Sequence, residues 1–175
     1  GFPIGIALFV ETSMFCVIAL LIGGMGAIVV ASHQVAINLA SLTFMVAVGV
    51  TQAAAVLVGR AVGAGDPEQA RRSAGAGLLF VGGMMVFFGA VFLSLPEMLA
   101  RIYSTDMVVV GLAATLIPVA GIFQVFDGLQ AVASGALRGV GDTFAPMVVN
   151  LVGFWFIGLP ISLYLGFRAG LGPLG

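Results

Sequence analysis

Long stretches without a charged residue are the feature that most constrains this chain. Residues 34–59, 73–96 and 143–167 contain no Asp, Glu, Lys or Arg, and two further apolar runs are interrupted only by Glu11 and Asp127. A helix of ~20 apolar residues crosses a bilayer, so each run is long enough. Only 7% of the residues are charged, whereas soluble domains carry about 25%. We therefore expect an integral membrane protein with about five transmembrane helices.

Local signals divide the chain into five expected helices, over residues 3–23, 32–59, 67–94, 107–137 and 143–166. The sequence Asp66-Pro67-Glu68-Gln69 is typical of a helix start, with a capping side chain, a proline at the first helical position and a glutamine at the third. A connection is expected over 95–106. The expected fold is one all-α membrane domain over residues 1–175.

The arginines predict the orientation, because cytoplasmic loops collect basic residues. The second and fourth connections hold four of the six, namely Arg60, Arg71, Arg72 and Arg138. Arg101 and Arg168 fall on the other side. The first helix is therefore expected to run outward from the cytoplasm.

The charge balance also excludes a class of partner. The net charge is −1, and nucleic-acid binding needs a concentrated basic patch. The chain begins at an apolar segment without methionine, so we expect a fragment of a longer protein.

Two acids lie inside the expected spans. By helical rise, Glu11 is ~12 Å along its helix from Pro3, and Asp127 is ~16 Å before Arg138. A charged carboxylate at that depth costs at least ~2.5 kcal/mol, and such residues commonly mark ion or proton pathways. Burial favours the neutral carboxyl group, so each acid can hold a proton, and the same oxygens can coordinate Na⁺. Glu11 and Asp127 are therefore candidate cation sites, including for Na⁺ as a metal ion.

Side chains at spacings of three or four residues place a stripe on one face of two expected helices. The stripe in 107–137 is Gln124, Asp127, Gln130 and Ser134, and the stripe in 32–59 is Gln34, Asn38, Ser41 and Phe44, with Gly49 and Gln52 further along. Together with Glu11 they predict a wet interior cavity. The alternative is that the acids are protonated packing residues and the amides join helices, at ~0.6 kcal/mol each.

The strings Gly63-Ala64-Gly65-Asp66 and Gly139-Val140-Gly141-Asp142 resemble the GxGD motif of intramembrane aspartyl proteases. Asp127 and Asp142 would be ~22 Å apart along a helix, too far for two carboxylates to share a proton. Both strings also precede an expected helix start, so a turn followed by a cap explains them better.

Several longer segments resemble the multidrug and toxic compound extrusion (MATE) transporters, with the bacterial NorM-like branch nearest. They are residues 31–45, the segment 62–66 with Arg71-Arg72, and residues 123–130 and 135–143. Residues 3–5 ahead of Glu11, and 153–160, extend the similarity along the chain.

The resemblance implies twelve helices in two six-helix lobes, with this chain covering the seventh to eleventh. It implies that Glu11 and Asp127 are the cation-site acids of the C-terminal lobe, and that Gln34 and Phe44 face the cavity. A phenyl ring there would attract a lipophilic cation through its π face. Pro118 stands where relatives often have another residue.

The expected function is cation-coupled antiport of organic cations across the inner membrane, driven by Na⁺ or H⁺, with no enzymatic activity and no other cofactor. The expected partners are organic cations, the coupling ion, membrane lipid and the N-terminal lobe of the same protein. The cavity residues are Gln34, Asn38, Phe44, Gln124 and Gln130. A flippase for lipid-linked saccharides, from the same superfamily, is the alternative. It should have a more basic cavity, whereas only acids lie mid-membrane here.

Overall fold

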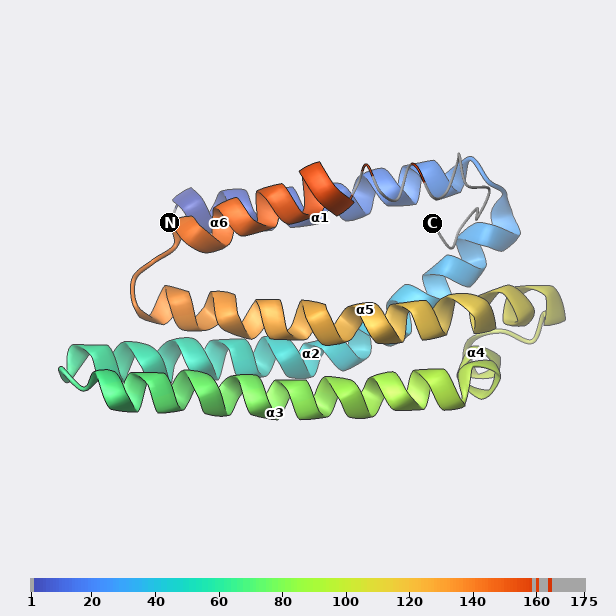
Figure 1. The fold of residues 1–175 in the computed structure, drawn as a ribbon. Coiled ribbons are helices and arrows are strands. Elements are labelled where there is room, and N and C mark those ends of the chain that lie inside the picture. The colour runs from blue at the N-terminus through green and yellow to red at the C-terminus, as the bar shows by residue number, and fades with distance from the viewer. Residues whose placement is uncertain (1, 159, 161–163, 165–175) are drawn as a thin grey trace. The chain divides into compact units, whose positions relative to one another are not determined.

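The computed structural model describes residues 2–158, 160 and 164, and its regular elements in this part of the chain are all helices (Figure 1). The elements are α1 (Phe2–Gly23), α2 (Ala27–Gly63), α3 (Pro67–Ser94), α4 (Pro96–Tyr103), α5 (Met107–Gly139), α6 (Phe144–Asn150) and a π-helical segment, η1 (Leu151–Gly158). In a bilayer every backbone polar group must be satisfied within the protein, and a helix does this within one segment. The predicted all-α class is confirmed.

Three described helices are long and apolar enough to cross a membrane: α2 with 37 residues, α3 with 28 and α5 with 33. Much of their apolar surface is exposed, including Leu79 and Phe87 on α3 and Met45 on α2. Such exposure suits contact with lipid. Two shorter apolar helical stretches, Thr12–Gly23 and Phe144–Gly153, fall within the first and last predicted spans, whose full extent stays a prediction.

The connection expected over 95–106 contains α4, which is a correction to the sequence prediction. Pro96 occupies the first position of this helix, Glu97 lies in its first turn and Arg101 in its last, which all favour a helix. Ala100 is fully buried. The sequence did not predict α4 because Glu97 and Arg101 interrupt the uncharged runs from which the helices were predicted. The second helix also begins earlier than expected, at Ala27, directly after Gly26 with its positive φ of 110°.

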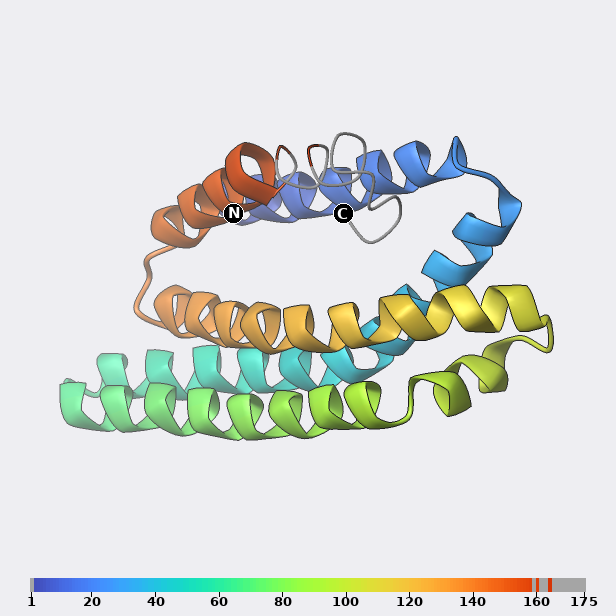
Figure 2. The same ribbon diagram turned by 45° about the vertical axis from the view of Figure 1, so that its right-hand side comes forward.

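The chain divides into two compact units, and α2 and α5 each contribute to both. Unit 1 comprises residues 1–36, 97–116 and 144–175, and unit 2 comprises 37–96 and 117–143. Figures 1 and 2 both draw α3 beside the parts of α2 and α5 that belong to unit 2. Within unit 1, α6 and η1 pack on α1.

The centre of unit 2 is a small apolar cluster with contributions from all three of its helices. It is formed by Ala47, Ala54, Val81, Met85 and Val132, with partly buried residues such as Phe44 and Leu129 packed around it. Alanine and valine dominate this cluster, so the helices meet over short side chains.

Glycines of α5 allow the backbones of unit 2 to approach more closely still. A Cβ atom at Gly135 would lie 2.6 Å from the carbonyl oxygen of Thr51 on α2. On the α3 side, a Cβ at Gly121 would lie 2.9 Å from the Cβ of Phe92. No side chain fits at these distances. Lipid gives helices little hydrophobic reason to associate, so close packing over small residues takes that role.

Polar contacts between helices also occur among the described residues of unit 1. The hydroxyl of the buried Ser32 on α2 lies 3.1 Å from the carbonyl oxygen of Val109 on α5. The indole Nε1 of Trp155 in η1 donates to the carbonyl oxygen of Val10 on α1 at 3.2 Å. Each contact gives a polar group a partner inside an apolar region, where an unpaired group is costly.

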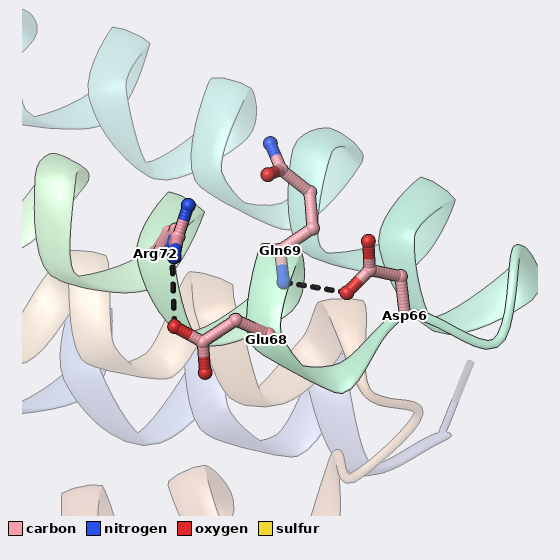
Figure 3. Close-up of polar contacts among 4 residues, drawn as sticks. All are labelled: Asp66, Glu68, Gln69 and Arg72. Carbon is pink, nitrogen blue, oxygen red and sulfur yellow. Dashed lines mark hydrogen bonds and ion pairs between the residues drawn. The ribbon is translucent and has the colours of Figure 1, made fainter.

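The predicted start of α3 is confirmed (Figure 3). The backbone N–H of Gln69 donates to Oδ1 of Asp66 at 2.9 Å, which makes Asp66 the N-cap, and Arg72 Nε lies 3.0 Å from Glu68 Oε1. Gly65 before the cap has a φ of +72°, a left-handed conformation that glycine adopts at little cost.

The second GxGD string has the same form. Gly141 has a φ of +90°, and the N–H of Asp142 donates to the carbonyl oxygen of Leu137 at 3.0 Å, between α5 and α6. Both strings are turns that end one helix and precede the next.

Gly135→Ala should lower the thermal unfolding midpoint of the detergent-solubilised protein. Its Cβ would push α5 away from the α2 backbone, and overpacking of this kind costs ~1–3 kcal/mol. Gly83→Ala on α3 is the matched control, because nothing lies within 4 Å of its added Cβ. Equal midpoints for the two variants would contradict the close α2–α5 contact.

Asp66→Ala should fray the first turn of α3, because loss of an N-cap costs ~1 kcal/mol. Hydrogen exchange should accelerate at the amide of Gln69. Asp66→Asn preserves an accepting oxygen and should leave the exchange rate near wild type. If both variants exchange alike, the capping bond contributes nothing.

Candidate functional site

Asp127 is the one charged side chain in the membrane-spanning middle of unit 2, all of whose residues are described. It is half-buried on α5, 12 residues before the helix ends at Gly139. The other charged groups of unit 2 lie at or near helix ends: Arg60, Asp66, Glu68, Arg71, Arg72, Arg138 and Asp142. Asp127 is therefore placed where a charge is expensive.

Gln124, one turn before Asp127, is almost completely buried, with 3% of its surface exposed. Its Oε1 lies 2.6 Å from Oγ1 of the buried Thr43 on α2. Its Nε2 is buried and has no hydrogen-bond partner in the described part of the chain. This contact joins α2 to α5, and because Thr51 meets Gly135 further along both helices, the two helices run parallel here.

The stripe predicted on α2 is not the face of that helix that meets α5. Asn38 and Ser41 are exposed, whereas Thr43 is buried against Gln124. At 3.6 residues per turn, Thr43 lies on roughly the opposite side of α2 from them. Gln34 is exposed and belongs to unit 1. The structure therefore joins Gln124 to Thr43, which the sequence analysis did not single out.

Two aromatic residues of unit 2 have different surroundings. Phe44 is half-buried and packs against the apolar cluster of unit 2. Phe123 on α5 is 53% exposed and precedes Asp127 by one turn. Residues four apart share a helix face, so the spacing itself could have suggested Phe123. The assignment of Phe44 and Gln130 to a cavity stays a prediction.

The backbone of Glu11 lies in α1, but its side chain is outside the described residues. The turn that carries it is held by its neighbours: the carbonyl oxygen of Val10 accepts from Trp155 Nε1 at 3.2 Å and from Ser13 Oγ at 2.9 Å. The role of Glu11 as a cation ligand stays a prediction. In the described part of the chain no three His, Cys, Asp or Glu side chains gather into a metal cluster.

Comparison with known sequences decides the family. The MatE family profile matches residues 3–164. The chain belongs to the MatE family. Over its whole length it is 45% identical to the multidrug resistance protein PmpM of Pseudomonas aeruginosa and 43% identical to the probable multidrug resistance protein NorM of Xanthomonas axonopodis pv. citri. It spans 38% of the length of each of these two relatives.

Two solved structures share the MatE chain's fold, with TM-scores of 0.87 and 0.88 over 99% of this chain and 38% of theirs. One is a MOP superfamily transporter from Pyrococcus furiosus, and the other is a multidrug resistance MATE family transporter in an outward-facing conformation. Each is 20% identical to this chain, so the likeness concerns the fold alone. It is the fold of part of a lobe in an all-α membrane transporter.

MatE membership confirms the predicted family resemblance. The relatives that the chain matches are multidrug resistance proteins. The turns at Gly65 and Gly141 account for both GxGD strings, so the protease alternative has no remaining support.

Proposed function

We propose that this chain is part of a cation-coupled exporter of organic cations in the inner membrane, in which Asp127 binds the coupling ion. The observation that carries the proposal is the position of Asp127, a half-buried acid in the middle of the long apolar helix α5. The names of the relatives, multidrug resistance proteins, support the choice of cargo. Glu11 on α1 is proposed as the second acid.

In the proposed mechanism the organic cation and the coupling ion compete for the same carboxylate, and the transporter alternates between two conformations that open to opposite sides of the membrane. An unoccupied carboxylate attracts an organic cation, and Na⁺ or H⁺ at the same group removes that attraction. Phe123, exposed one turn away from Asp127, offers an aromatic face to the organic part of the cargo. Coupling requires the ion to bind one conformation more tightly than the other, since only differential affinity shifts a conformational equilibrium.

The chain covers 38% of its relatives' length, so the proposed activity concerns a full-length transporter that contains this lobe. Gln34, Asn38 and Gln130 are each proposed as a contact of the cargo. The remaining helices of a full-length relative would supply further contacts, since transporter sites commonly lie between repeats.

Asp127→Asn should reduce ion-driven efflux of a fluorescent organic cation to the rate of protein-free vesicles. The amide keeps the shape of the side chain but cannot carry a negative charge. Efflux is measured with the full-length protein in vesicles under an imposed Na⁺ or pH gradient. Glu11→Gln is tested beside it and should have the same effect.

Asp66→Asn is the matched control, because it makes the same chemical change at an exposed N-cap outside the membrane-spanning region. It should leave efflux unchanged. Wild-type efflux in both Asp127→Asn and Glu11→Gln would show that neither acid carries the coupling ion.

A further inference from the structure

The amide of Gln124 has one end held and one end without a partner. Oε1 is 2.6 Å from Thr43 Oγ1, while Nε2 has no hydrogen-bond partner in the described residues and is shielded from solvent. Leaving a buried polar group unpaired costs ~1–3 kcal/mol. A glutamine that joined two helices only for stability would not need such a free end.

Thr43 has a single hydroxyl proton and three oxygens nearby. Its Oγ1 lies 2.6 Å from Gln124 Oε1, 2.9 Å from the carbonyl oxygen of Ala40 and 3.3 Å from that of Leu39. If the Thr43 hydroxyl donates its proton to Gln124 Oε1, both hydrogens of the buried –NH₂ group remain unpaired. The amide has a second orientation, turned by half a rotation about its last bond, in which the nitrogen takes the place of the oxygen.

The second orientation uses both hydrogen-bonding functions of the threonine. Nε2 of Gln124 then donates to Thr43 Oγ1, which donates to the carbonyl oxygen of Ala40, a bond that threonine commonly makes within a helix. The free end of Gln124 becomes a carbonyl oxygen. The carbonyl oxygen and one of the two amide hydrogens are then unpaired, but this orientation makes two hydrogen bonds, whereas the first makes only the one from Thr43 to Gln124.

We propose that Gln124 supplies this carbonyl oxygen to the cation bound at Asp127, and that Thr43 is the positioning residue that selects the orientation. The inference rests on the proposed function. Gln124 and Asp127 are three residues apart on α5, which makes them neighbours with Cβ atoms ~5–6 Å apart. Carbonyl and carboxylate oxygens are the ligands that hard cations prefer.

The same oxygen suits either coupling ion. It coordinates Na⁺ directly, and it accepts a hydrogen bond from the carboxyl group when Asp127 holds a proton. The first orientation would instead direct two N–H bonds toward the cation. On the helices packed around this pair, the other charged groups lie near the helix ends: Arg60 on α2, Glu68, Arg71 and Arg72 on α3, and Arg138 on α5, with Asp66 and Asp142 in the adjoining turns.

The test uses the full-length transporter in vesicles and measures the ion concentration that gives half-maximal efflux of ethidium. One arm imposes a Na⁺ gradient and the other a pH gradient, and the wild type identifies which ion drives efflux. In that arm, Thr43→Val should raise the half-saturating ion concentration about tenfold, as loss of an outer partner of a cation site does. Gln124→Met removes the proposed ligand itself and should raise it at least as much. Ethidium affinity without a gradient should not change.

Two variants distinguish positioning from packing. Thr43→Ser keeps the hydroxyl and should restore the wild-type ion dependence. Thr51→Val removes another buried hydroxyl of α2, one that donates only to the carbonyl oxygen of Ala47 in its own helix, at 2.7 Å. It should leave the ion dependence unchanged, because Thr51 holds no side chain of α5.

Wild-type half-saturation in both Thr43→Val and Gln124→Met would overturn the inference, while ion-driven efflux in the wild type would leave the proposed function standing. A change in ethidium affinity without a change in ion dependence would also overturn it, because the amide would then bind the cargo. Absence of ion-driven efflux in the wild type would reject the proposed function and this inference together.

Discussion

Lipid gives membrane helices little hydrophobic driving force to associate. The close contact between α2 and α5 at Gly135 follows from that constraint. In water, burying leucines would hold such helices together, but lipid tails are as apolar as leucine. Dispersion forces between closely packed atoms remain, and they decline within an ångström of separation. Gly121, Gly128 and Gly135 place the α5 backbone within that distance of its neighbours. The apolar cluster of alanine, valine and methionine follows from the same requirement.

Close packing also determines where polar groups can lie. Thr43 and Gln124 meet on the faces where α2 and α5 approach, between the clustered apolar residues of unit 2. The contact with Thr43 holds one end of the Gln124 amide and leaves the other end without a partner among the described residues. Asp127 lies one turn further along α5, at the edge of this packed face and half-buried. The neutral packing therefore provides a fixed frame beside the one charged group.

The sequence predicted the long helices well, because spans and caps depend on neighbouring residues. The uncharged run 73–96 and the cap at Asp66 gave α3 within a few residues of its observed bounds. The short helix α4 was missed since an amphipathic segment with Glu97 and Arg101 does not form an apolar run. Asp127 was predicted as a cation site because a single acid in an apolar helix can be recognised from the sequence alone.

Pairing between helices was less predictable, because it depends on which faces meet. Periodicity placed Phe44 in the same stripe as Asn38, yet its ring packs against the apolar cluster while Asn38 is exposed. Thr43 lies among apolar neighbours and has no distinctive spacing, so nothing local marks it. Its importance comes from residue 124, which is 81 positions away in the sequence.

The magnitudes favour a functional origin for the Thr43–Gln124 pair over a purely stabilising one. Hydrogen bonds between membrane helices contribute ~0.6 kcal/mol on average, whereas an unpaired buried polar group costs ~1–3 kcal/mol. In either amide orientation one end of Gln124 has no partner among the described residues, so the pair gives a net loss of stability compared with two apolar side chains. Residues that break a local rule in this way are expected at functional sites, where stability is lost in exchange for activity. A ligand that pairs with the free end removes the cost of the unpaired polar group. Its binding is then more favourable by that amount.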